Sequence, residues 1–326
     1  MANNVALGIN TNFGYAEEST YGTRVAPTNF LNITTEGLKL SQAFNPITVL
    51  GKPHNADYVN GKRSVDGSFE LPGTYDKSTG VFLKHAMGSV ASTSLGGGAY
   101  SHVITPSGVL PVGLSLYVDR DSSTVGTAYA YQGCQISDLK LTLDAEQPLK
   151  VAVTVNGQDE TEVAYSGATI AAPKYIYWDQ TFTANMTASG VAVSGVQIHA
   201  FSFEVKTPLN ENRYSLGQRT KTGQGIGGVR TINGSMTIEF SDKTHYGYFR
   251  NGIEISGNFA MTGPAISGSN SYGIAIDIPR MKLDGNTPNV GGEGEITMEL
   301  PFTAYYDSGT SKLCSITLTN TNSSIS

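Results

Sequence analysis

The chain has 326 residues, of which 15% are charged and 39% hydrophobic, below the globular averages of about 25% and about 45–50%. Its 38 glycines and 13 prolines disfavour long helices and favour short strands joined by turns. A net charge of −6 has the wrong sign for a protein that binds nucleic acid by neutralising phosphates. The composition therefore predicts a β-rich protein, long enough for two domains with separate cores.

The sequence shows no targeting or membrane segment. Residues Met1–Ile9 lack the basic and apolar stretches of a secretory signal. The longest uncharged stretches, 85–118 and 180–203, are interrupted by Gly, Ser and Thr, which argues against a membrane span. Cys134 and Cys314 lack the close spacing of metal ligands. We expect two buried, reduced thiols in a protein that folds in a reducing cytoplasm.

Strict alternation of apolar and polar residues predicts the strands. The segments that show it are 65–71, 139–143, 151–155, 201–205, 274–278 and 296–302. Each has one apolar and one mostly polar face, which is typical of antiparallel sheets packed on one side. Asn156 and Gly157 follow the third segment, and this dipeptide predicts a hairpin turn.

Two segments have the signals of short helices. Residues 76–88 begin with Asp76 as a capping residue, continue with a short amphipathic run and end at Gly88. Residues 241–252 follow the same order, from Ser241 to Gly252. Each predicted helix closely follows an alternating strand, which suggests an internal repeat.

The repeat has an offset of 167 residues. Residues 63–71 align without gaps on 230–238, with Arg, Gly and Ser identical and four further positions conservatively exchanged. The same offset places Phe82 on Phe249 within the predicted helices. Chance resemblance between Gly-rich β segments is the alternative. The offset shared by a strand and its helix favours duplication, with the junction at 166–174.

A long stretch of weak periodicity occupies the same place in each half, at 41–62 and 207–229. Stretches of this length inside compact domains are usually functional or mobile. Basic residues gather in or beside both of them. Two interpretations remain: ordinary surface charge, or mobile basic loops that contact an acidic surface of a neighbouring subunit and become ordered on assembly.

The sequence shows no catalytic or metal-binding motif. The five histidines are scattered, and neither an HExxH pair nor a Gly-x-Ser-x-Gly elbow occurs. Residues 159–162 are interpreted as a solvated acidic turn. Residues 223–228 lack the strand, the helix and the Lys-Ser/Thr ending of a phosphate-binding loop. We therefore expect no catalytic residue, no cofactor and no metal.

The order of these segments resembles that of a known family. In the first half, the likeness rests on residues 36–40, the stretch up to Arg63, residues 65–71 and the helix through Phe82. Its counterparts in the second half are residues 201–205, 232–240 and the helix through Phe249, and residues 14–27 resemble the family's opening. The chain thus resembles the tail tube (major tail) protein of long-tailed, siphovirus-type bacteriophages, in a tandem-duplicated form.

The resemblance implies a mainly β fold with two tandem tail-tube-like β-sandwich or barrel domains, each with one short helix and a long extended loop. The domains implied are an N-terminal arm at 1–27, a first domain at 28–166, a linker at 167–174 and a second domain at 175–326. Such a protein is a non-enzymatic virion component, assembled in the bacterial cytoplasm. It forms stacked rings, trimeric and pseudo-hexameric for a duplicated chain, which make the tail tube that conducts DNA into the host.

The partners implied are other copies of the chain, a tape measure protein inside the tube, tail terminator and distal tail proteins, and double-stranded DNA that passes without specific binding. No membrane insertion is implied. The loops and the arm would bridge rings. The candidate assembly residues are Phe44, Pro46, Lys52, His54, Tyr58, Lys62, Arg63, Arg213, Arg219, Lys221 and Arg230.

Two other functions stay open. The chain is alternatively a virion-displayed β-sandwich adhesin that binds host-surface glycan through an aromatic platform. The residues for such a platform are Tyr75, Tyr117, Tyr131, Tyr175 and Trp178. A hydrolase is disfavoured because no nucleophile or metal pattern is visible.

Overall fold

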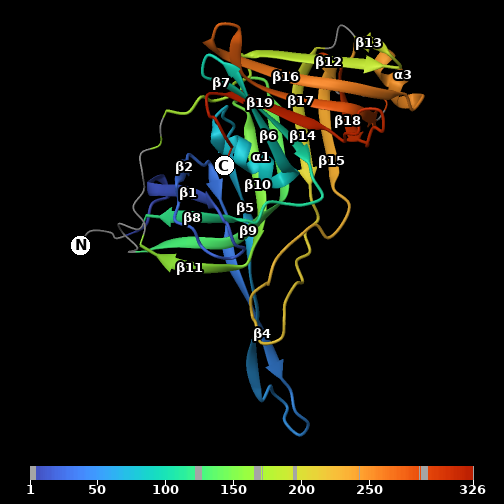
Figure 1. The fold of residues 1–326 in the computed structure, drawn as a ribbon. Coiled ribbons are helices and arrows are strands. Elements are labelled where there is room, and N and C mark those ends of the chain that lie inside the picture. Colours follow the sequence, from blue (N-terminus) through green and yellow to red (C-terminus); the bar gives the residue numbers. More distant parts are fainter. Residues whose placement is uncertain are drawn as a thin grey trace.

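The computed structural model describes residues 5–121, 127–164, 170, 172–193, 197–241, 243–285, 287 and 293–325. The expected β-rich fold is confirmed: these residues form nineteen strands, joined in one antiparallel network that does not close into a barrel (Figure 1). The arrangement is consistent with a β-sandwich. Of the linker expected at 167–174, only residues 170 and 172–174 lie within the described part of the chain.

One sheet of the first half consists of β2 (Asn29–Leu31), β1 (Thr11–Glu17), β8 (Leu114–Arg120), the first part of β9 (Ala128–Asp144) and β11 (Asp159–Val163). A short 3-10 helix, η1 (Gly8–Asn10), precedes β1. Strand β1 lies in the segment expected as an N-terminal arm, where it pairs with β2 and β8. Its Phe13 and Tyr15 are buried in the core.

The second sheet runs through both halves of the chain. Its first-half strands are β3 (Thr35–Glu36), β4 (Lys39–Ile47), β5 (Asp57–Pro72), β10 (Lys150–Gly157) and the last part of β9. Asp138–Asp144 of β9 then pair with Ala200–Lys206 of β14 (Ile198–Lys206). The sheet continues into β15 (Thr231–Glu239) and β18 (Thr297–Ala304). The two halves are thus joined edge to edge by backbone hydrogen bonds.

The remaining strands cover the second half and tie it to the first. They are β6 (Gly88–Gly96), β7 (Ala99–Pro106), β12 (Thr181–Ala188), β13 (Val191–Val193), β16 (Glu254–Ser267), β17 (Asn270–Leu283) and β19 (Ser315–Asn320). Strand β19 lies between β17 and β7, so a strand near the C-terminus pairs with the first half.

Aromatic side chains fill the space between the layers in each half. In the first half, Phe69 of β5 has its ring centroid 4.8 Å from that of Phe13 and 5.4 Å from that of Phe82 in the helix. In the second half, Phe201 of β14 lies 4.6 Å from Phe259 of β16. The alternating apolar residues of the predicted strands therefore face two cores, as an antiparallel sheet packed on one side requires.

Both expected helices are present. The first, α1 (Lys77–Met87), follows Asp76 and ends at Gly88, whose φ of 113° belongs to the left-handed region that favours glycine. The second, α3 (Thr244–Arg250), is shorter and buries only His245 among its residues. The carboxylate of Asp76 accepts a hydrogen bond from the Lys174 N–H, 3.0 Å away, instead of capping the helix.

The predicted hairpin turn at Asn156 and Gly157 is wrong. Strand β10 includes both residues, and Asn156 and Gly157 pair with Asp66 and Val65 of β5. The next strand, β11, pairs with β9 in the other sheet. Burial of Asn156, whose amide donates to the Asp66 carboxylate, outweighs the local preference of the dipeptide for a turn.

The stretch at 41–62 is also more regular than its weak periodicity suggests. It forms most of a long hairpin from β4 and the first part of β5, paired from Gln42 with Arg63 to Ile47 with Asp57. Most side chains on both faces of this part are exposed. Alternation of apolar and polar residues is therefore missing, because neither face packs on a core.

The segments aligned by the repeat occupy matching places. Strands β5 and β15 are each preceded and paired by one strand, β4 or β14, and each is followed by a helix. A Cβ atom on Gly67 of β5 would lie 2.4 Å from the Gly37 oxygen, and one on Gly234 of β15 would lie 2.2 Å from the Ser202 oxygen. Both glycines permit close approach of the preceding segment.

Candidate assembly surface

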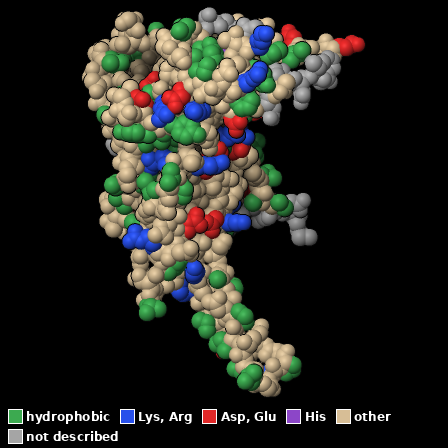
Figure 2. All heavy atoms as spheres, turned by 90° about the vertical axis from the view of Figure 1, so that its right-hand side faces the viewer, with side chains coloured by type: hydrophobic (Ala, Val, Ile, Leu, Met, Phe, Trp, Pro, Cys, Tyr) green, Lys and Arg blue, Asp and Glu red, His purple; other side chains and the backbone are tan. Residues whose placement is uncertain are grey.

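The most prominent surface feature is the β4–β5 hairpin, which projects far beyond the body of the molecule (Figure 1). Hydrophobic side chains lie along it up to its tip (Figure 2). Phe44 and Tyr58 are 60% and 63% exposed and meet edge to face, with ring centroids 6.0 Å apart. Leu50 in the turn is fully exposed. Apolar groups held this far from a core are typical of interaction surfaces.

Five of the sequence-predicted assembly residues lie on the outer part of this hairpin. Pro46 pairs with Tyr58 across the two strands, and Lys52 and His54 are exposed in the turn region. A proline is tolerated here because β4 is an edge strand. Together with Phe44, these residues form one continuous structure, which we call the hairpin tip (residues 44–60).

The second long stretch, 207–229, behaves differently and folds back against the base of the hairpin (Figure 1). The Arg63 N–H donates to the Arg219 oxygen over 2.8 Å, and Arg219 Nε donates to the Gly61 oxygen over 3.2 Å. The Tyr214 hydroxyl donates to the Arg63 oxygen over 3.1 Å. We call this segment the strap, because it runs beside β5 where β10 has ended.

Side chains strengthen the contact between strap and hairpin. Lys62 Nζ lies 3.2 Å from the Asn212 amide oxygen and 4.9 Å from the centre of the Tyr214 ring. Arg63 forms an ion pair of 3.0 Å with Asp159 at the start of β11. The basic residues at the hairpin base therefore have partners within the chain, and the segment expected as an acidic turn supplies one of them.

Lys221 anchors the strap in the body of the protein and is only 1% exposed. Its ammonium group contacts the amide oxygen of Asn156, and its carbonyl accepts a hydrogen bond of 2.6 Å from Gln158. Burial lowers the pKa of the Lys221 ammonium, while the nearby Asp66 opposes that shift. Asn156 and Gln158 were not expected at this site, because the sequence predicted a turn there.

The last two predicted residues are also held within the chain. Arg230 Nε donates to the Thr207 hydroxyl over 2.9 Å, and its Nη1 donates to the Ser107 oxygen over 3.1 Å. The Arg213 oxygen accepts a hydrogen bond of 2.9 Å from the Thr222 N–H. The structure thus brings Lys62, Arg63, Arg219 and Lys221 together at the hairpin base and places Arg230 away from them, beside Ser107. Contact with a neighbouring subunit stays a prediction.

A second candidate surface is the polar face of the sheet that runs through both halves. Alternation along the paired strands places on this face the charged residues Asp66, Glu70, Asp138, Lys140, Asp144, Lys150, Glu204, Lys206, Glu239 and Glu299. Carboxylates outnumber lysines. Burial raises the pKa of Asp138 on this face, and the neighbouring Glu204 adds to the shift.

The aromatic platform proposed for glycan binding does not exist as a surface. Tyr75, Tyr117 and Tyr131 are buried in the core. Trp178 is 48% exposed, whereas Tyr175 is half-buried. Three of the five side chains needed for the platform are therefore inaccessible to a sugar.

The state of the two cysteines agrees with the sequence analysis. Cys134 and Cys314 are buried and free, as expected, and burial raises the pKa of the Cys314 thiol to about 12. Among the described residues, no helix is long and apolar enough to cross a membrane.

Comparison with known proteins points to one family. A search of curated proteins returns no match to the chain. A family model described as "Phage tail tube protein" matches residues 8–304. The matched segment contains the hairpin, the strap and the sheet that joins the two halves. Because the match spans nearly the whole chain, the chain belongs to the phage tail tube protein family.

Proposed function

We propose that the chain is a structural virion protein that polymerises into stacked rings, and that these rings form the tail tube through which DNA passes into the host. Family membership supports a structural tail-tube role. The main observation in favour of ring formation is the pairing of β9 with β14 within one chain. Contacts between chains would repeat the same kind of pairing.

The unpaired edge of β4 supports ring formation. Strand β4 pairs with β5 as β14 pairs with β15, and β9 occupies the other side of β14. Within the described residues, the only strand paired with β4 is β5, and β3 also pairs with β5 rather than with β4. An open edge is a template for strand addition. Addition of a neighbouring chain at β4, repeated head to tail, closes a ring.

A chain that contains two tube units would form a trimeric ring. The matching order of β4, β5 and α1 with β14, β15 and α3 fits two copies within one chain. We propose domains at 28–166 and 175–326, preceded by an arm at 1–27 and joined by a linker at 167–174. Three such chains would place six tube units around one axis.

The polar face of the continuous sheet suits a DNA passage. Closure of the ring at β4 would direct this face inward, because the opposite face packs on the two cores. Its excess of carboxylates would repel phosphates and let DNA slide without specific binding. The predicted tape measure protein would occupy the same lumen before DNA does.

The hairpin tip suits contact between successive rings. It extends away from the body, and its exposed Phe44, Leu50 and Tyr58 would be buried against the next ring. Tail terminator and distal tail proteins would meet the two ends of the tube. Assembly in the bacterial cytoplasm and the absence of enzymatic activity belong to the same proposal.

Sedimentation velocity of the purified full chain tests ring formation. The proposal predicts a discrete ring oligomer and larger stacked species that grow with protein concentration. Because edge pairing uses backbone groups, the ring should persist at low and high ionic strength. A chain that stays monomeric at every concentration and ionic strength would contradict the proposal.

A further inference from the structure

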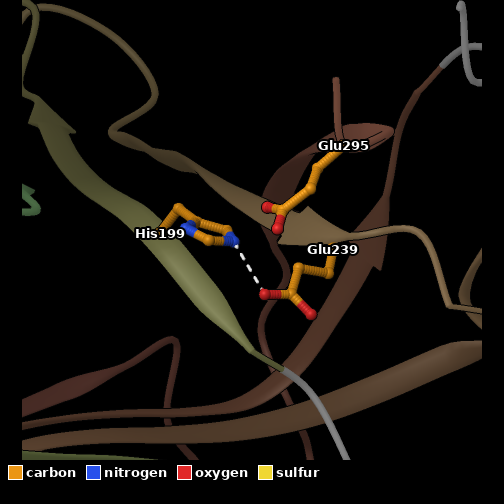
Figure 3. A group of neighbouring side chains, drawn as sticks. All are labelled: His199, Glu239 and Glu295. Atoms are coloured by element: carbon orange, nitrogen blue, oxygen red, sulfur yellow. Dashed lines mark hydrogen bonds and ion pairs between the residues drawn. The ribbon is translucent and has the colours of Figure 1, made fainter. Parts of the chain in front are cut away.

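Three side chains able to bind a metal converge at one end of the polar face. His199 belongs to β14, Glu239 ends β15, and Glu295 lies two residues before β18. Their ligand atoms all lie within 4.8 Å of one another. Figure 3 shows the three side chains pointing toward one another from three separate segments. The sequence gives no local signal for this group, because its members are far apart along the chain.

The backbone around the group is held by hydrogen bonds. The Ala145 N–H donates to the His199 oxygen over 3.2 Å, and the Glu239 N–H donates to the Gln197 oxygen over 3.2 Å. Next to Glu295, the Phe240 N–H donates to the Ile296 oxygen over 2.9 Å. The three side chains therefore start from fixed positions, which lowers the entropic cost of gathering them around one ligand.

The distances fit one small cation. Zinc bonds to imidazole nitrogen and carboxylate oxygen of about 2.0–2.2 Å place tetrahedral ligand atoms roughly 3.3–3.5 Å apart. His199 Nε2 and Glu239 Oε1 are already 3.2 Å apart. Glu295 is exposed, so its side chain is free to close the remaining gap by rotation.

Charge and ligand type narrow the identity of the cation. Two carboxylates with a neutral imidazole carry a charge of about −2, which a divalent cation compensates. A proton on His199 would compensate only one of these two negative charges. An imidazole ligand favours zinc and similar transition metals over magnesium and calcium, which prefer oxygen ligands. The exposed side of the group leaves room for water as a fourth ligand.

We propose that His199, Glu239 and Glu295 bind one divalent transition-metal cation of the zinc class. The cation would link β14, β15 and the start of β18, the three second-half strands of the continuous sheet. This proposal departs from the sequence-based expectation of no metal, which no observation has tested. It is independent of the tube proposal, because all three ligands come from one chain.

Zinc titration of the unassembled full chain, first treated with a chelator, tests the site. Calorimetry or competition with a zinc indicator should show one zinc per chain. His199→Ala and Glu239→Gln should each weaken zinc binding by at least about tenfold. Magnesium in the same titration should bind far more weakly. Zinc should also raise the melting temperature of the wild-type chain, and not that of His199→Ala.

Two control variants separate this site from incidental binding. His54 is the other exposed histidine, and Glu299 is an exposed carboxylate on the same face. His54→Ala and Glu299→Gln should keep the wild-type affinity. Circular dichroism without metal checks that each variant is folded. Equal zinc binding by the wild type and His199→Ala, or loss of binding in His54→Ala, would overturn the proposal.

Discussion

The backbone N–H of Arg63 donates a hydrogen bond of 2.8 Å to the carbonyl oxygen of Arg219. It ties the residue that follows the first long stretch of weak periodicity to the second stretch, and the two stretches occupy matching places in the two halves of the chain. The first stretch forms the projecting hairpin, and the second is a strap at the base of that hairpin. The two stretches therefore differ in structure: the first projects from the body, and the second lies against the chain itself.

Loss of the Lys221 side chain should loosen the strap. Lys221→Ala would leave a cavity and remove the buried cation from the Asn156 oxygen. We expect a loss of about 1–3 kcal/mol in the free energy of unfolding, measured by urea denaturation. Limited proteolysis should show new cleavage within the strap, residues 207–229. The exposed Lys52→Ala is the matched control, and equal protease resistance of the two variants would contradict the role of Lys221.

Removal of most of the hairpin tip should separate ring formation from stacking. We expect a chain that lacks residues 46–60 to keep its melting temperature, because this part packs on neither core. Its assemblies should stop at single rings in sedimentation velocity. Tubes of normal length after the deletion would contradict the role of the tip.

A single apolar residue of the tip permits a finer version of this experiment. Leu50 in the hairpin turn and Leu216 in the strap are both fully exposed. Leu50→Asp should shorten or abolish stacked species, because it would place a charge in the contact between rings. Leu216→Asp should assemble as the wild type does. Equal loss of stacking in both variants would show that the contact is not specific to the tip.

Gly67 and Gly234, which occupy matching places in β5 and β15, should tolerate no side chain. Gly234→Ala would force a Cβ atom against the Ser202 oxygen and the Phe302 ring. We expect it to cost about 2–3 kcal/mol of stability, measured by chemical denaturation. Gly108→Ala is the control, since a Cβ atom there would meet no heavy atom within 4 Å outside its chain neighbours, and should stay within about 0.5 kcal/mol of the wild type. Similar stability of the two variants would refute the close-approach role.

Glu17 should make the fold sensitive to acid. Burial opposes ionisation of its carboxyl, but hydrogen bonds from His85 and Lys84 outweigh this and lower the pKa from 4.5 to about 2. A carboxyl whose pKa is lower in the folded state stabilises the fold above its unfolded pKa. The stabilisation should therefore disappear as the pH falls from about 5 toward 2.

Substitution of Glu17 tests this assignment. Glu17→Gln should be less stable than the wild type at neutral pH and should lose less stability on acidification. Glu299→Gln, at an exposed position of β18, is the matched control. Parallel curves of stability against pH for the wild type and Glu17→Gln would contradict the assignment.

Much of the fold follows from local patterns, whereas most of the assembly surface does not. Apolar residues alternate with polar ones along 65–71 and 201–205 because one face of each strand packs on a core. This alternation is what predicts the two strands from the sequence. The β4–β5 hairpin faces no core and therefore has no such period. At Asn156, burial against Asp66 and Lys221 overrode a strong turn signal. The strap and the group at His199 depend on contacts between distant segments, which local sequence patterns do not record.

Electron microscopy of the purified full chain, with rotational averaging of end-on views, tests the tube proposal most directly. The pairing of β9 with β14 and the open edge of β4 predict rings with a central pore, three chains around the axis and an approximate sixfold outline. Stacked rings should appear as tubes in side views. Particles without a pore, or single chains under all conditions, would contradict the proposal.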